Sequence, residues 1–215
     1  MGFKVNKNNS FNFIIIVLLI SLSMNIYLSI MNNRYKYKMG EESYNNLVEL
    51  KVRNESALNI IKQCLKSESI NSQELFALYE NYSHMTDSYN ELWISYNDYG
   101  KEELLNLPFS RSKENYIESN LVYSRIEDVL YQYINKKSDD NLDIINLNGQ
   151  VLENFIIMES LAVEVSDYYN KQKDDGISDE KKEFKLIMKG QWIDYLEDIS
   201  SIMEKYLEKE FIALE

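Results

Sequence analysis

The sequence predicts an all-α protein, in which an N-terminal transmembrane helix precedes an antiparallel bundle of four to five long helices with coiled-coil-like seams. The chain of 215 residues has only 1 Pro and 6 Gly, too few breakers for a fold with many tight turns. An uncharged apolar run lies near its start, and apolar residues further on recur at alternating steps of three and four. No segment of four or more residues alternates strictly between apolar and polar, so we expect no β-sheet.

The apolar run covers residues 13–31, which read FIIIVLLISLSMNIYLSIM and contain no charge. A helix needs about 20 such residues to cross a bilayer. Arg34, Lys36 and Lys38 follow together with tyrosines, as is typical of a membrane interface. We therefore expect an uncleaved signal-anchor. The alternative is a signal peptide cleaved after Ser23, although the apolar run continues beyond that residue.

Charge divides the chain into two unequal parts. Residues 1–38 hold five basic and no acidic side chains, so 23 − 5 = 18 bases remain against 35 acids downstream, a net charge of −17. We expect a basic tail (1–12), the transmembrane segment (13–31), a basic and aromatic neck (32–40) and an acidic helical-bundle domain (41–215). Nucleic acid is a poor partner for such a domain, since Lys and Arg must neutralise its phosphates.

The orientation of the anchor is less clear than its presence. Two basic residues precede the apolar run and three follow it closely, so the positive-inside rule nearly ties. A short basic tail before a single anchor usually stays inside, and we expect a single-pass protein of the cell membrane with an extracytoplasmic domain. The opposite orientation stays open. Richness in Asn, Lys, Ile and Tyr is typical of AT-rich bacterial or phage genomes.

The first two helices of the bundle are expected at 41–67 and from a cap at Asn71 to about Gly100. Asn71 and Glu74 have the spacing of a capping box, and Asn54 interrupts the first apolar stripe, where it either fixes the register or faces a wet edge. The two stripes are Leu47, Leu50, Ala57, Ile61 and Cys64, and then Leu75, Leu78, Tyr82, Met85, Tyr89, Leu92, Tyr96 and Tyr99.

Three further helices complete the prediction. They are expected at about 113–136, from about Asp143 to the residues before Gly176, and from Ser178 or Asp179 to about Tyr206. The stripe of the first is Val122, Ile126, Val129 and Tyr133, with Leu121 and Leu130 beside it. The stripe of the second is Val151, Phe155, Met158, Ala162, Val165 and Tyr169, widened by Leu152, Ile156 and Leu161. The stripe of the third is Phe184, Met188, Tyr195, Ile199, Ile202 and Tyr206, flanked by Trp192 and Leu196.

Two segments are candidate interaction sites. The first is a membrane-proximal loop with an unusual number of apolar side chains, Leu104, Leu105, Leu107 and Phe109. We expect this loop to contact lipid, to close the end of the bundle or to pack as a short turn on the core. The second is a tyrosine seam, which either accepts a helix of a partner or packs internally with its hydroxyls reaching solvent: Tyr82, Tyr89, Tyr96 and Tyr99.

The sequence offers little for catalysis. The presence of one His, His84, argues against a His-based metal centre or a catalytic triad. The near-match to a calcium loop at Asp139–Asp143 lacks its required Gly. Cys64 is expected to be a buried thiol, although exposure would allow a disulfide-linked homodimer. No nucleotide-binding or nucleophile motif is present. We therefore expect no cofactor, no metal and no enzymatic activity.

Two functions remain as expectations. The first is a non-enzymatic interaction module on the membrane, an accessory subunit, scaffold or inhibitor of a membrane or envelope complex, which binds a protein partner and could form homo-oligomers. The alternative is an extracytoplasmic small-molecule-binding or sensory bundle, an analogy with bacterial chemoreceptors at the level of helix count alone. A polar-lined cavity between the helices would favour the second, and an exposed apolar stripe the first.

Overall fold

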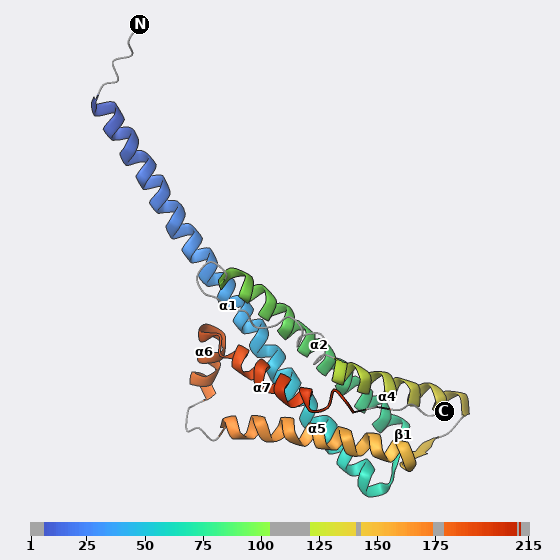
Figure 1. The fold of residues 1–215 in the computed structure, drawn as a ribbon. Helices are drawn as coiled ribbons and strands as arrows, with labels where there is room; N and C mark the ends of the chain where they lie inside the picture. Colours follow the sequence, from blue (N-terminus) through green and yellow to red (C-terminus); the bar gives the residue numbers. More distant parts are fainter. Residues whose placement is uncertain (1–6, 104–120, 141–142, 174–178, 210, 212–215) are drawn as a thin grey trace.

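A computed structural model describes residues 7–103, 121–140, 143–173, 179–209 and 211 of the chain (Figure 1). These residues are mostly helical, as the sequence predicts. The described elements are the helices α1 (Lys7–Ser67), α2 (Ser72–Glu103), α4 (Leu121–Asp140), α5 (Gly149–Lys173), α6 (Asp179–Lys189) and α7 (Trp192–Glu204), with two short strands, β1 (Ser69–Asn71) and β2 (Ile144–Asn146).

The longest element, α1, joins two regions that differ in their surroundings. Its first part extends away from the rest of the molecule, and its second part packs against α2, α5 and α6 (Figure 1). The predicted stripe of this second part is confirmed as buried: Leu47, Leu50, Ala57, Ile61 and Cys64. Asn54 is only 2% exposed, and its Nδ2 donates a hydrogen bond to the Ala162 carbonyl of α5 at 2.9 Å. The polar interruption of the stripe is therefore a core residue that joins two helices.

α2 runs antiparallel to α1 and begins with the predicted capping box. The Asn71 side chain accepts hydrogen bonds from the backbone N–H groups of Gln73 and Glu74 at 2.9 and 3.0 Å, and Glu74 Oε2 accepts one from the Asn71 N–H at 3.1 Å. These bonds satisfy N–H groups that have no partner within the helix. The expected end at Gly100 is wrong, because α2 continues to Glu103. A single Gly weakens a helix by about 1 kcal/mol, which is too little to end one on its own.

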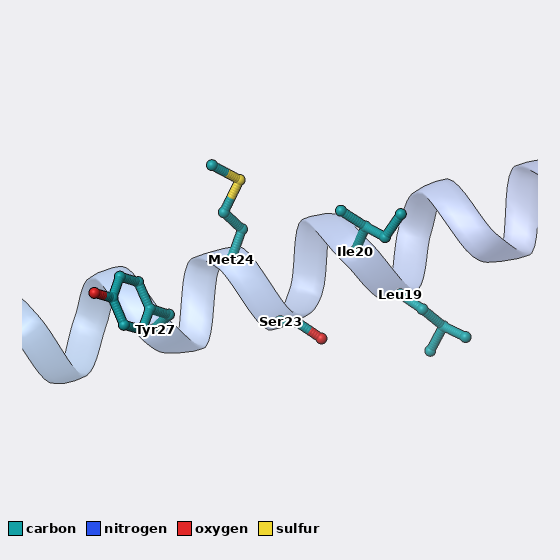
Figure 2. A pocket seen from close by; sticks show the side chains of 5 residues that line it. All are labelled: Leu19, Ile20, Ser23, Met24 and Tyr27. Carbon is teal, nitrogen blue, oxygen red and sulfur yellow. The ribbon is translucent and has the colours of Figure 1, made fainter.

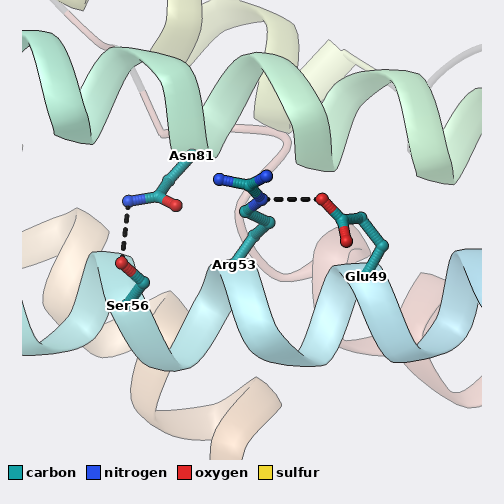
Figure 3. Close-up of polar contacts among 4 residues, drawn as sticks. All are labelled: Glu49, Arg53, Ser56 and Asn81. Atoms are coloured by element: carbon teal, nitrogen blue, oxygen red, sulfur yellow. Dashed lines mark hydrogen bonds and ion pairs between the residues drawn. The ribbon is translucent and has the colours of Figure 1, made fainter.

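Polar contacts also mark where α1 and α2 lie side by side. Figure 3 shows Asn81 of α2 donating through Nδ2 to Ser56 Oγ of α1 at 3.0 Å. One turn earlier on α1, Arg53 Nε donates to Glu49 Oε1 at 2.7 Å within the same helix. The Ser56–Asn81 pair places the first third of α2 beside the part of α1 farthest from the apolar run.

The prediction that the chain lacks a sheet is wrong. β1 and β2 pair antiparallel, with Ile70 opposite Ile145 at the centre of the three pairs, and both of these side chains are buried. The strands are the connections that follow α1 and precede α5, and Leu147 N donates to the Glu68 carbonyl beside them at 2.9 Å. Three residues are too few to show a period of two in the sequence, and the pairing depends on bringing two distant turns together.

The stripes predicted for α4 and α5 are confirmed as buried, except at three flanking positions. Leu152 is half-buried, and Leu121 and Ile156 are exposed. α5 begins at Gly149 and not near Asp143, because residues 144–146 form β2. The expected start of the third helix, near Lys113, lies outside the described residues. The core thus consists of the facing sides of α1, α2, α4, α5 and α7, together with Leu186 of α6 and the central residues of the strands, Ile70 and Ile145.

The predicted fifth helix is wrong as a single element, because it is broken into α6 and α7 at Gly190. Gly190 has φ 67°, a left-handed conformation that glycine adopts without strain and that turns the chain. The break changes which side is buried, so Phe184 and Met188 are exposed while Leu186 and Ile187 are buried. α7 buries the side chains Trp192, Leu196, Ile199 and Met203.

Candidate functional site

The apolar run of α1 is fully helical and nothing in the described part of the chain covers it. Its most apolar 18-residue window has a mean hydropathy of 2.4, and no part of this window is buried. Figure 2 shows five side chains of this region, from Leu19 to Tyr27, projecting from the one helix. The depression between them is lined by that helix alone and is not an enclosed pocket. By length and composition this helix could cross a membrane.

Burial begins abruptly at the end of the basic neck. Tyr35 and Tyr37 are exposed, Lys38 Nζ lies 3.5 Å from Glu42 Oε1 at the surface, and Met39 is already in the core. Gly40 explains how another element can approach α1 so closely here. A Cβ atom at this position would lie 2.2 Å from the Ile187 carbonyl oxygen of α6. The absence of a side chain at residue 40 therefore allows the backbone of α6 to rest on α1.

A groove of about 460 Å³ opens between α1, α5, α6 and α7, next to this contact. Its walls combine aliphatic side chains with amines, carboxylates and tyrosines. The lining residues are Tyr44, Leu47, Val48, Lys51, Val52, Glu55, Tyr169, Gln172, Lys182, Glu183, Leu186 and Tyr195. This volume lies within the range of small-molecule sites.

Two hydrogen bonds hold the walls of the groove together. Tyr169 Oη donates to the Leu47 carbonyl at 3.0 Å, and Lys182 Nζ donates to the Gln172 carbonyl at 2.6 Å. Burial raises the pKa of Tyr169 above its usual range, so its hydroxyl stays protonated and can donate. The groove could hold a small molecule with an apolar body and a charged group. No sequence signal pointed to it, because its lysines lie on α1 and α6, far apart in the chain.

The predicted tyrosine seam lies mainly inside the protein. Tyr82 and Tyr89 are buried, Tyr96 is half-buried, and the side chain of Tyr99 is not among those described. Tyr123 of α4 covers the seam, with ring centroids 6.1 Å from Tyr82 and 5.8 Å from Tyr89. In this structure the first two tyrosines therefore pack internally and present no surface to a partner.

The sequence predicts tyrosine hydroxyls that reach solvent, but several of them form hydrogen bonds inside the core. Tyr89 Oη lies 2.8 Å from Ser200 Oγ, which itself donates to the Leu196 carbonyl at 2.7 Å, so Tyr89 is the donor of this pair. Asn154 Nδ2 donates to Tyr133 Oη at 2.6 Å. The hydroxyl of Tyr82 has no hydrogen-bond partner in the described part of the chain. Burial raises its pKa.

The reactive side chains do not form a catalytic arrangement. His84 is exposed on α2, whereas Cys64 is fully buried, which removes the condition for a disulfide-linked homodimer. Burial, followed by the charge of Glu74, raises the pKa of the Cys64 thiol to about 12, so it is a poor nucleophile at neutral pH. Among the described residues, no group of three or more His, Cys, Asp or Glu side chains could hold a metal ion.

One exposed carboxylate links two helices of the core. Glu164 of α5 accepts hydrogen bonds from Lys205 Nζ and, at 2.8 Å, from Tyr206 Oη, just beyond α7. The bond from Lys205 is the main reason that the pKa of Glu164 is lowered. This contact joins the end of α7 to α5.

The predicted membrane-proximal loop, Leu104, Leu105, Leu107 and Phe109, lies outside the described residues and stays a prediction. Comparison of the chain with protein-family models finds none that matches, and comparisons with curated proteins and with solved structures find no significant match either.

Proposed function

We propose that this protein is a single-pass membrane protein whose antiparallel helical bundle acts as a non-enzymatic interaction module. In this role it is an accessory subunit, scaffold or inhibitor of a membrane or envelope complex, with the bundle on the extracytoplasmic side of the cell membrane. The proposed absence of catalysis rests on the composition, with one His and one Cys in 215 residues.

The observation that carries the proposal is the exposed apolar half of α1. In water, this many uncovered apolar side chains on one helix would be a severe aggregation hazard, while in a bilayer they are in their preferred solvent. Because the same helix continues to Ser67, the proposed anchor and the first helix of the bundle form one continuous helix. A partner would therefore meet the bundle at a defined height above the membrane.

Membrane fractionation tests the anchor. We expect the full-length chain to stay in the membrane pellet after washing with alkaline carbonate and to leave it in detergent. Recovery of the intact chain in the carbonate supernatant would overturn the proposal, and a chain shortened by about 23 residues would favour the cleaved signal peptide.

Labelling of intact cells with a membrane-impermeant maleimide tests the orientation. Since the native Cys64 is buried, a variant with one added cysteine has little background labelling. We expect Phe76→Cys, an exposed position on α2, to react in intact cells, and Asn8→Cys to react only after permeabilisation. The reverse pattern would place the bundle in the cytoplasm.

A second function is favoured by the groove between α1, α5, α6 and α7. Its size and mixed lining suit a small molecule, which is the alternative of a ligand-binding or sensory bundle. Native mass spectrometry of the full-length chain purified in mild detergent separates the two roles. A retained small molecule that is lost in Val48→Trp, which fills the groove, would favour ligand binding. A small molecule that is retained equally in Val48→Trp would not favour ligand binding in the groove.

A further inference from the structure

An exposed aromatic cluster lies on α2 and α4, in the region of the molecule remote from the apolar half of α1. The ring centroids of Phe76 and Tyr79 are 6.4 Å apart, and those of Tyr79 and Tyr131 are 6.1 Å apart. Phe76 is 52% exposed and Tyr131 is 53% exposed. Clustered, exposed aromatic rings are typical of the energetic centres of protein interfaces. We name Phe76, Tyr79 and Tyr131 the distal aromatic patch.

The surroundings of the distal aromatic patch are acidic. Residues 72–100, which form most of α2, include five carboxylates and no Lys or Arg. On α4, Glu127 and Asp128 precede Tyr131 by four and three positions, so they share its face of the helix. Desolvation, followed by the charge of Glu127, raises the pKa of Tyr79. The nearest Arg of α4, Arg125, is engaged by the Leu207 carbonyl at 2.7 Å. The patch therefore offers aromatic faces within a negative field, the combination that attracts a cation.

The position of the patch limits what can occupy it. Asn81 bonds to Ser56, so this part of α2 lies beside a residue of α1 that is 25 positions beyond Met31. At about 1.5 Å per residue this is roughly 37 Å past the apolar run, whereas the headgroup region of one leaflet is only about 5–8 Å deep. Lipid headgroups do not extend to this height.

A second copy in the same bilayer is an equally poor occupant. Two basic surfaces of this chain also expose apolar or aromatic side chains. They are the neck, with Tyr35, Tyr37 and Lys38, and α6, with Phe184, Lys185 and Lys189, and the neck is the nearer of the two to the apolar run. α6 rests on Gly40, which is 16 residues, or about 24 Å, nearer the membrane than Ser56. Two copies anchored at the same depth would keep these surfaces apart, so the occupant belongs to a different protein.

We infer that the distal aromatic patch binds a cationic segment of a partner protein, with Arg or Lys side chains stacking on Phe76 and Tyr131 and pairing with Glu127 and Asp128. This inference rests on the proposed interaction function and names the partner chemistry for it. Cation–π contact and charge pairing reinforce one another here, because both carboxylates share a face of α4 with Tyr131.

The experiment titrates the full-length protein, held in phosphatidylcholine nanodiscs, with tetra-arginine and with tetra-citrulline, its uncharged analogue. Calorimetry should show that tetra-arginine binds at least tenfold more tightly than tetra-citrulline and that salt weakens its binding. Equal binding of the two peptides, or no binding of tetra-arginine, would overturn the inference.

Variants then locate the binding. Phe76→Ser combined with Tyr131→Ser should weaken tetra-arginine binding at least fivefold, as should Glu127→Gln combined with Asp128→Asn. Phe184→Ser is the matched control, because this Phe is 55% exposed but lies on α6. If the control and the aromatic variant bind tetra-arginine with equal affinity, the peptide responds only to the net negative charge of the protein, and the inference is wrong.

The same preparations separate this inference from the anchor proposal. If carbonate releases the chain from membranes but tetra-arginine binding still depends on Phe76, the anchor proposal is wrong and the distal aromatic patch is supported. A chain retained in membranes that does not distinguish the two peptides would keep the anchor and remove the patch.

Discussion

The two halves of α1 contain similar aliphatic residues and meet different surroundings. Leu19 in the first half is 58% exposed, whereas Leu50 in the second half is 1% exposed, although both belong to one continuous helix. The first half is apolar on every side, and the second half is apolar on one stripe and polar elsewhere. The change occurs within a few residues of the basic neck, where Met39 and Gly40 meet α6.

This difference shows that helix formation and burial are separate questions in this chain. Backbone hydrogen bonds within the segment are equally satisfied in both halves, so the helix continues through the neck. What differs is the number of sides that avoid water. A helix that is apolar all round needs an apolar solvent or complete burial, whereas an amphipathic one needs only neighbouring helices. The following substitutions test this contrast, from the largest expected effect to the smallest.

Truncating the same residue type in each half should give the largest difference. We expect Leu50→Ala to lower the free energy of unfolding by about 2–5 kcal/mol, because it leaves a cavity in the core. Leu19→Ala should change it by less than about 0.5 kcal/mol. Urea unfolding of the full chain in mild detergent, followed by the fluorescence of buried Trp93 and Trp192, measures both. Equal effects would show that the first half also packs against the protein.

A charge in the apolar half of α1 should affect membrane retention and leave the stability of the folded domain unchanged. Leu19→Arg places a cation near the middle of the proposed span, where it disfavours membrane insertion by about 2.5–3.5 kcal/mol. We expect loss from the carbonate-resistant membrane fraction, with unchanged tryptophan-monitored unfolding of the detergent-solubilised chain. Leu19→Ala serves as the control for insertion. Full retention of the Arg variant would argue against a bilayer-spanning role.

The junction between the halves should be sensitive to a single methyl group. Gly40→Ala forces its Cβ against the Ile187 backbone, and we expect it to destabilise the docking of α6 by about 1–3 kcal/mol. The effect should appear as faster amide hydrogen exchange in α6. Glu41→Ala, at the exposed neighbouring position, should leave this exchange unchanged. Unaltered protection in Gly40→Ala would mean that α6 does not rest on α1 in solution.

Removing a tyrosine hydroxyl should have the smallest effect of these substitutions on the free energy of unfolding. Tyr27 and Tyr35 are exposed around the apolar half, whereas Tyr82 and Tyr89 are buried beside the other half. Tyr89→Phe removes the bond to Ser200 and should lower the unfolding free energy by about 0.5–1.5 kcal/mol. Tyr82→Phe removes an unpaired hydroxyl and should be neutral or slightly stabilising. The same urea titration compares them, and a larger loss for Tyr82→Phe would contradict the hydrogen bonding described above.

Local patterns identified most of the helices and much of the core. The stripe from Leu75 to Leu92 follows the helical period over several turns, and packing buries it as the period requires. The Asn71–Glu74 capping box is a bond between residues three apart, so it can be identified without knowing the fold. The uncharged run can also be recognised from the sequence, because its length and composition alone make it a candidate membrane span.

Two of the wrong predictions, the absence of a sheet and the buried side of residues 179–189, concern contacts between distant residues. β1 exists because two helix connections meet and bury Ile70 against Ile145, and neither strand has a recognisable period of its own. Periodicity suggested one helix through residue 190, because Phe184 and Met188 are in phase with Tyr195, but Gly190 turns the chain and buries Leu186 instead. The groove and the distal aromatic patch likewise combine side chains from separate helices.

The sequence by itself determined where helices form, which of their sides are apolar, and that one uncharged segment is apolar all round. These are properties of neighbouring residues, set by hydrogen bonds and side-chain spacing within a few turns. Only the tertiary structure decided which tyrosines are covered by α4, how Gly40 receives α6, and which aromatic rings stay at the surface between acidic side chains. Those outcomes depend on which helices face one another, and burial against a specific neighbour is not encoded in the period of either helix alone.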